Sequence, residues 1–68
     1  MNSYYYIAIT KAIKPFKKGD FDSVELALNE FVDMHLPAND TQKSAIEAAR
    51  ANSGIPSDLI DIFEEVSA

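Results

Sequence analysis

The chain has 68 residues and a formal net charge of -5, and this length allows one small domain with no room for a second module. It contains no cysteine, which excludes disulfides and thiolate metal sites. The lack of cysteine also gives no sign of an oxidising compartment, so we expect a cytoplasmic protein. With 47% hydrophobic and 25% charged residues, the composition is that of an ordinary globular protein. We expect a single small acidic domain over residues 1–68, and the patterns below predict that it is helical.

The charges divide the chain into a short basic arm and an acidic body. The only charged residues before Gly19 are four lysines, Lys11, Lys14, Lys17 and Lys18, whereas from Asp20 onward two basic residues stand against eleven carboxylates. Affinity for nucleic acid comes chiefly from clustered lysine and arginine. We therefore expect no direct nucleic-acid contact by the body, and we favour as partner a larger protein with a basic surface.

Residues 3–14 carry two conflicting patterns. Three tyrosines, three isoleucines and a threonine favour a strand by propensity. By contrast, the apolar and aromatic residues of one side recur at helical spacing; they are Tyr5, Ile9, Ala12, Ile13 and Phe16. We expect a helix that Ser3 caps and Pro15 ends. The alternative is a strand, which requires a second copy of the chain because no other segment offers a strand to pair with. The most apolar run, residues 4–9, is far shorter than the roughly 18 residues of a membrane-spanning helix, so we expect no association with a membrane.

The longest helical pattern covers residues 22–36, and we expect the other helices to pack around it. At about 100° per residue, its apolar residues fill an arc of roughly 200°, wider than the stripe of an ordinary surface helix. We expect Val24, Leu28 and Phe31 to form the centre of the core. The full arc contains Phe21, Val24, Ala27, Leu28, Phe31, Val32, Met34, His35 and Leu36.

The ends of this helix have local signals. Asp22 is the expected N-cap, and Glu25 completes a capping box. Leu26 lies outside the apolar arc and is expected to close on Phe21 as a hydrophobic staple. Pro37 stops the helix near the residue that precedes it.

Two further helices follow. Asn39 together with Gln42, or Asp40 alone, can cap a helix that continues to Asn52. Its inner side is mostly alanine, and we expect it to pack closely against the helix at 22–36.

The last connector and helix complete the fold. Gly54 is expected in the left-handed conformation, with Ile55 folding back towards Ala49, and Pro56 or Ser57 opens the final helix. The apolar residues of this helix stand at i, i+3, i+4 and i+7 and are Leu59, Ile62, Phe63 and Val66. These patterns predict an all-α fold, a small bundle of three to four short helices.

The sequence offers little to catalysis. His35 is the only histidine, and we interpret it as a half-buried packing residue or a cation at a helix C-terminus. One histidine with scattered carboxylates has no recognisable metal-ligand spacing, and the two glycines, Gly19 and Gly54, form no phosphate-binding loop. We therefore expect no enzymatic activity, no metal and no cofactor.

The candidate partner-binding residues are acidic and aromatic. A carboxylate face either docks on a lysine- and arginine-rich groove or serves only as a solvated surface. Three consecutive tyrosines cannot all point inward from one helix, and exposed tyrosine is enriched at protein contacts. The candidates are Asp58, Asp61, Glu64 and Glu65 on the last helix, Glu30 and Asp33 on the helix at 22–36, and Tyr4, Tyr5 and Tyr6.

Residues 41–63 open with Thr41-Gln42 at a helix start and continue with Gly54-Ile55 and Ile60. This pattern resembles the repressor-type helix-turn-helix, a resemblance that implies DNA binding. In that family an alanine precedes the turn glycine by four residues, whereas here Arg50 holds that position. The second helix also carries carboxylates where contacts to bases and phosphates are made, and we do not expect this element to bind DNA.

We interpret the chain as a small acidic protein-interaction module, a stoichiometric inhibitor or adaptor that docks on a basic surface of a larger partner. By analogy only, phage-encoded inhibitors that mimic the charge of DNA and block nucleic-acid-handling machines share this build. The alternative is a self-associating structural or regulatory protein, a homodimer formed through residues 4–13. A third interpretation is a DNA-binding regulator of the helix-turn-helix type.

Overall fold

The computed structural model describes residues 4–34 and 41–67, and these residues contain helices and no strand. A single residue, Ala12, separates the first two helical segments, so together they form one kinked helix. The all-α prediction is confirmed. The segments are α1 (Tyr4–Lys11), α2 (Ile13–Lys18), α3 (Phe21–Asp33), α4 (Gln42–Arg50) and α5 (Ser57–Ser67).

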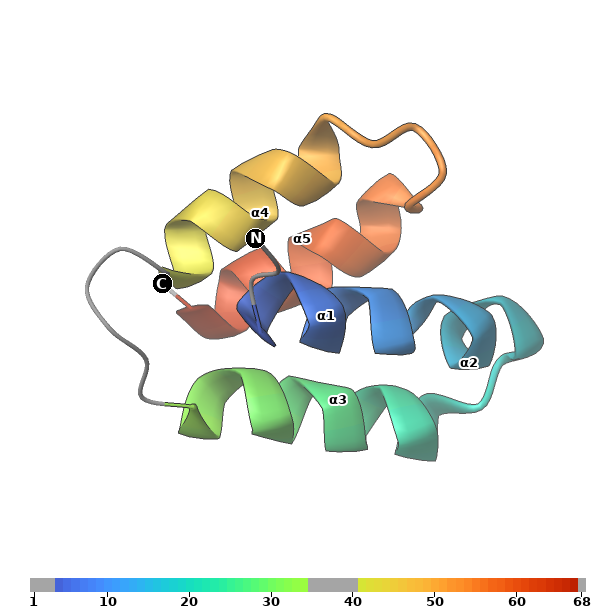
Figure 1. Cartoon of the computed structure of the whole chain (residues 1–68). Coiled ribbons are helices and arrows are strands. Elements are labelled where there is room, and N and C mark those ends of the chain that lie inside the picture. Colours follow the sequence, from blue (N-terminus) through green and yellow to red (C-terminus); the bar gives the residue numbers. More distant parts are fainter. Residues whose placement is uncertain (1–3, 35–40, 68) are drawn as a thin grey trace.

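Four of the helices form a closed ring around one core (Figure 1). In the order α1, α3, α5, α4, each helix packs against the next, and α4 returns to α1. The short α2 extends α1 and packs against α3. In Figure 1, α1 and α3 run in opposite directions, and so do α4 and α5, whereas α3 and α5 run the same way.

The N-terminal segment is a helix, as predicted, and the strand alternative is wrong. Tyr5, Ile9 and Ala12 are buried in the chain's own core, with Ala8 beside them. Residues at i, i+3, i+4 and i+7 share one side of a helix, so this burial favours the helix over the strand propensity of the tyrosines and isoleucines. The expected cap, Ser3, lies outside the described residues.

Pro15 lies inside α2 and does not end a helix, so that prediction is wrong. Proline has no N–H to donate to the carbonyl four residues back, and the chain kinks just before it. At the kink the Ala12 N–H donates to the Ile9 carbonyl at 3.1 Å, and the helical pattern resumes with Phe16 N–H donating to the Ala12 carbonyl at 2.9 Å. Proline is tolerated there because the first turn of a helix needs no such donors.

Gly19 ends α2 in the left-handed conformation, with φ 78°. Its N–H donates to the Phe16 carbonyl at 3.2 Å, and the Asp20 N–H donates to the Pro15 carbonyl at 2.9 Å. This pair of bonds is a Schellman motif, which satisfies the last carbonyls of a helix.

α3 begins and ends earlier than predicted. Its N-cap is Asp20, whose carboxylate accepts from the Ser23 N–H at 3.3 Å and the Ser23 hydroxyl at 2.8 Å. Asp22 is therefore inside the helix, and the predicted capping box with Glu25 is wrong. At the other end Met34 is already extended, with ψ 137°, while Leu36 and Pro37 lie outside the described residues.

More of the apolar surface of α3 is exposed to solvent than predicted. Val24 and Phe31 are buried as expected and Leu28 is half-buried. However, Phe21 and Leu26 are 63% and 66% exposed. Phe21 is the first residue of α3 and follows the N-cap Asp20, whereas a hydrophobic staple needs the residue before the cap, so the predicted staple is wrong. Val32 is also exposed, at 38%. α3 forms one side of the ring, and no other described helix covers its outward surface.

α4 is capped by Thr41, which accepts from the Ser44 N–H at 3.0 Å, while the Thr41 N–H donates to the Ser44 hydroxyl at 3.4 Å. The candidate caps Asn39 and Asp40 lie outside the described residues. The predicted alanine side is confirmed, with Ala45 and Ala49 buried.

The predicted partner of α4 is wrong. α4 packs against α1 and α5, because α1 also presents small side chains, Ala8 and Ala12, and small residues on both helices let their backbones approach. A hydrogen bond that Gln42 Nε2 donates to the Phe31 carbonyl at 3.2 Å joins α4 to α3.

The turn between α4 and α5 depends on Asn52 and not on a left-handed glycine. Gly54 has no positive φ, so that prediction is wrong. The Asn52 side-chain oxygen accepts from the Gly54 N–H at 2.9 Å, and the Asn52 carbonyl accepts from the Ile55 N–H at 3.1 Å. Ile55 is buried, and the Ile60 N–H donates to the Pro56 carbonyl at the predicted start of α5.

Three aromatic rings join α1, α3 and α5 at the centre of the core. Phe31 contacts Tyr5 with ring centroids 5.3 Å apart and Phe63 with centroids 5.0 Å apart, both edge to face. In α5, Leu59, Ile60 and Phe63 are fully buried, whereas Val66 is 42% exposed and Ile62 half-buried. The spacing predicted for α5 omitted Ile60, which is buried because α5 packs against both α3 and α4.

Candidate functional site

α3 and α5 form the acidic part of the surface. The two helices carry eight carboxylates and neither a lysine nor an arginine, and all eight are exposed. Because α3 packs against α5, these charges lie on two neighbouring helices. They are Asp22, Glu25, Glu30, Asp33, Asp58, Asp61, Glu64 and Glu65.

Four of these carboxylates lie in the last turns of the two helices. We call this group, Glu30, Asp33, Glu64 and Glu65, the acidic pole. The two helix ends are close to each other, since α3 and α5 run in the same direction in Figure 1 and Phe31 contacts Phe63. No basic residue occupies the last turn of either helix. The C-terminus of a helix carries a partial negative charge, so the pole adds four negative charges where the fold itself disfavours them.

Two cations from neighbouring helices contact this surface. Arg50 of α4 donates to Asp61 at 3.0 Å and to Glu64 at 2.9 Å, and its hydrogen bond with Asp61 raises the pKa of the guanidinium above its usual value. Lys11 of α1 lies 3.7 Å from Glu30. All of these side chains are substantially exposed, and exposed ion pairs contribute little to stability.

Asp33 and Glu65 are the members of the acidic pole without an ion pair among residues 4–34 and 41–67. Their counterparts in the first turns are Asp22 of α3 and Asp58 of α5. A carboxylate in a first turn stabilises a helix, whereas one in a last turn destabilises it. Each helix therefore has one carboxylate in its first turn that its dipole favours, and one in its last turn that its dipole disfavours and that has no ion pair among the described residues.

The three tyrosines predicted as contact residues have different environments. Tyr5 is buried, and its hydroxyl donates to the Met34 carbonyl at 2.8 Å, so its ring belongs to the core. Tyr6 is half-buried and accepts from Asn52 Nδ2 at 3.0 Å. Tyr4 is 62% exposed and lies on α1, which does not belong to the acidic surface.

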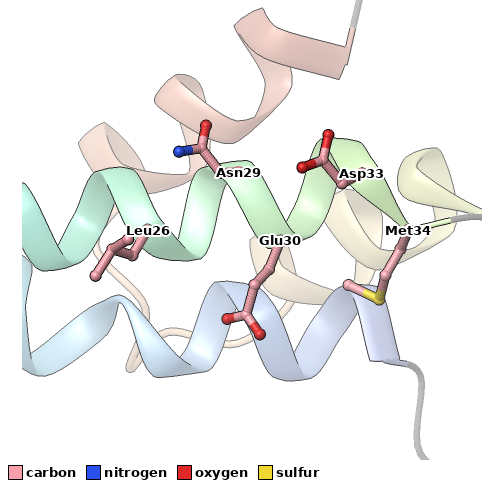
Figure 2. A pocket seen from close by; sticks show the side chains of 5 residues that line it. All are labelled: Leu26, Asn29, Glu30, Asp33 and Met34. Atoms are coloured by element: carbon pink, nitrogen blue, oxygen red, sulfur yellow. The ribbon is translucent and has the colours of Figure 1, made fainter.

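A shallow depression of about 440 Å³ runs along the outer side of α3 (Figure 2). Figure 2 shows two rows of side chains along it, one on the side of α1 and one on the opposite side of the helix. Sequence reasoning missed this feature, although the position of Leu26 outside the apolar arc was the available signal. The first row contains Leu26, Glu30 and Met34, and the second contains Asn29 and Asp33.

Metal-ligand groups and membrane-spanning helices are both absent from the described residues. Within residues 4–34 and 41–67, no three histidine, aspartate or glutamate side chains are grouped as metal ligands would be. In the same part of the chain, no helix combines the length and apolar composition needed to cross a membrane. His35 lies outside the described residues.

Comparison with known proteins finds no family model that matches the chain, no similar curated protein and no similar solved structure.

Proposed function

We propose that this protein is a small acidic interaction module that uses the surface of α3 and α5 to dock on a basic surface of a larger protein, as a stoichiometric inhibitor or adaptor. The observation that supports it best is the acidic pole. Natural proteins accept unfavourable local features mainly where function needs them. Like charges at two helix C-termini are such a feature, and a basic partner would remove the cost by neutralising them.

The layout also favours recognition by charge over recognition by an apolar patch alone. Complementary charge accelerates encounter and excludes partners of the same sign. A surface that normally binds phosphates has the matching sign, so the more specific form of the proposal is a phage-type inhibitor that occupies such a surface on a nucleic-acid-handling protein. We do not propose the dimer formed through residues 4–13, because Tyr5, Ile9 and Ala12 are used in the core.

The proposal is tested by affinity capture with a matched pair of variants. The pole variant, Asp33→Asn/Glu65→Gln, removes the two pole carboxylates that lack an ion pair. The first-turn variant, Asp22→Asn/Asp58→Asn, removes the same charge from the opposite ends of the same helices. Captured proteins are identified at about 50 mM and about 500 mM salt, since screening weakens exposed charge contacts over this range, and direct binding is then measured with purified components.

We expect the native chain and the first-turn variant to bind the same basic protein at low salt, and the pole variant to lose most of that binding. We also expect the complex to dissociate at high salt. Equal binding by both variants, or binding that does not change with salt, contradicts the proposal. A shift of duplex DNA by the chain alone would instead support the DNA-binding regulator.

A further inference from the structure

We propose that the depression along α3 receives an amphipathic helix of the partner, one that carries two apolar side chains about two turns apart with lysine or arginine between them. This inference depends on the proposed function and makes it more specific. The site is the α3 groove, defined by Leu26, Asn29, Glu30, Asp33 and Met34.

The shape of the α3 groove fits another helix. Leu26, Glu30 and Met34 stand at i, i+4 and i+8, and Asn29 and Asp33 also stand four residues apart, so the groove lies between two i±4 ridges (Figure 2). Packing a ridge of one helix into such a groove on another is the commonest mode of helix packing. From the first to the last of these residues the α3 groove extends about 12 Å, two helical turns at about 1.5 Å per residue.

The α3 groove has apolar anchors at its ends. Leu26 is 66% exposed, the highest value among the exposed large hydrophobic residues of the described chain, and no contact within the fold accounts for it. Met34 at the other end is half-buried, and its flexible thioether adapts to varied apolar surfaces. A leucine, isoleucine or phenylalanine of the partner at each end would cover surface that now faces water.

The middle of the α3 groove is acidic, and this selects the charge of the occupant. Glu30 and Asp33 lie between the two apolar ends, one in each ridge. The only cation near them in the described residues is Lys11, 3.7 Å from Glu30, a distance typical of a weak exposed pair. An arginine of the partner can bind a carboxylate through two parallel hydrogen bonds. The matching helix therefore carries, along one side, an apolar residue, then a basic residue, then a second apolar residue.

The test uses the full chain and a synthetic helical peptide as the probe. In the peptide two leucines stand two turns apart, two arginines occupy the turn between them, and the remaining positions are alanine and glutamine. A comparison peptide replaces both leucines with alanine and keeps the arginines. Binding is followed by amide NMR spectra of the native chain, of Leu26→Ala and of Phe21→Ala. The last variant is the matched control, because Phe21 lies on the same helix and is equally exposed, at 63%, but does not line the α3 groove.

We expect the leucine peptide to shift amides of residues 26–34, and Leu26→Ala to weaken its binding by about tenfold, the usual effect of truncating an apolar anchor. Phe21→Ala should bind as the native chain does, and the comparison peptide, which lacks both leucines, should bind the native chain more weakly than the leucine peptide binds Leu26→Ala. All three proteins should have the same helical circular dichroism, because both substituted residues are exposed.

Three results would overturn the inference. If the two peptides bind equally and Leu26→Ala has no effect, charge alone determines binding; the inference then falls while the proposed function stands. If neither peptide binds at low salt, the inference also falls, and capture with the pole variant decides the proposed function separately. If sedimentation shows a dimer that Leu26→Ala dissociates, the occupant is a second copy of the chain and not a partner helix.

Discussion

Removing the two pole carboxylates that lack an ion pair should stabilise the fold. In Asp33→Asn/Glu65→Gln, each substitution removes a negative charge from the last turn of a helix that has no basic residue there. A charge of the wrong sign at a helix end costs about 0.3–1 kcal/mol, so the variant should gain roughly 0.6–2 kcal/mol in free energy of unfolding. In a domain of this size, each kcal/mol corresponds to about 4–8 °C in melting temperature.

The first-turn variant, Asp22→Asn/Asp58→Asn, should change in the opposite direction, because its carboxylates lie in first turns and stabilise their helices. The assay is urea unfolding followed by circular dichroism at about 10 mM and about 1 M salt. The difference between the two variants should shrink at high salt, where the screening length falls from about 30 Å to about 3 Å. A pole variant less stable than the native chain would refute the reasoning, since the carboxylates would then hold the fold together.

The remaining predictions concern the core and the turns. Phe31→Leu should cost about 1–3 kcal/mol, because it removes two edge-to-face pairs of about 0.5–1.5 kcal/mol each, whereas Phe21→Leu on the exposed side should change stability by less than about 0.5 kcal/mol; similar losses in urea unfolding would contradict the ring cluster. Tyr5→Phe should cost about 0.5–1.5 kcal/mol for the hydrogen bond to the Met34 carbonyl, and an unchanged unfolding midpoint would argue against that bond. Gly19→Ala should cost about 1–2 kcal/mol because of the left-handed backbone alone, since no neighbour lies within 4 Å of an added Cβ; a stabilised variant in thermal unfolding would show that φ there is negative.

The fold could be predicted from the sequence because the spacing of apolar residues outweighs local propensity. Tyr5, Ile9 and Ala12 mark one side of a helix although their neighbours favour a strand, and the structure buries that side. Val24 and Phe31 were predicted in the core in the same way. A helix needs only its own sequence to define an apolar side, so these predictions required no knowledge of packing partners.

Helix ends were predicted less well because several residues compete for each cap. Asp20 and Asp22 both precede the apolar pattern of α3, and Ser23 decides between them by donating to Asp20 through both its N–H and its hydroxyl. Gly54 is a usual helix terminator, but the side chain of Asn52 supplies the turn before the glycine is needed. Such choices depend on hydrogen-bond geometry in the folded chain, which residue types do not specify.

The candidate site was only partly predictable, because it depends on how helices are arranged. The carboxylates of the acidic pole could be named from the sequence, but their proximity results from α3 and α5 running side by side in the same direction, joined by Phe31 and Phe63. The α3 groove results from Leu26 remaining exposed on the outer side of the ring. Neither relation can be derived from periodicity within one helix.

The most direct test of the proposed function is a map of amide chemical-shift changes when the captured basic protein is added to the labelled chain. We expect the largest changes at the C-terminal halves of α3 and α5, around Asp33 and Glu65, with little change in α2. Changes confined to α2 and its lysines, or to the side of α4 that faces away from α5, would contradict docking through the acidic surface.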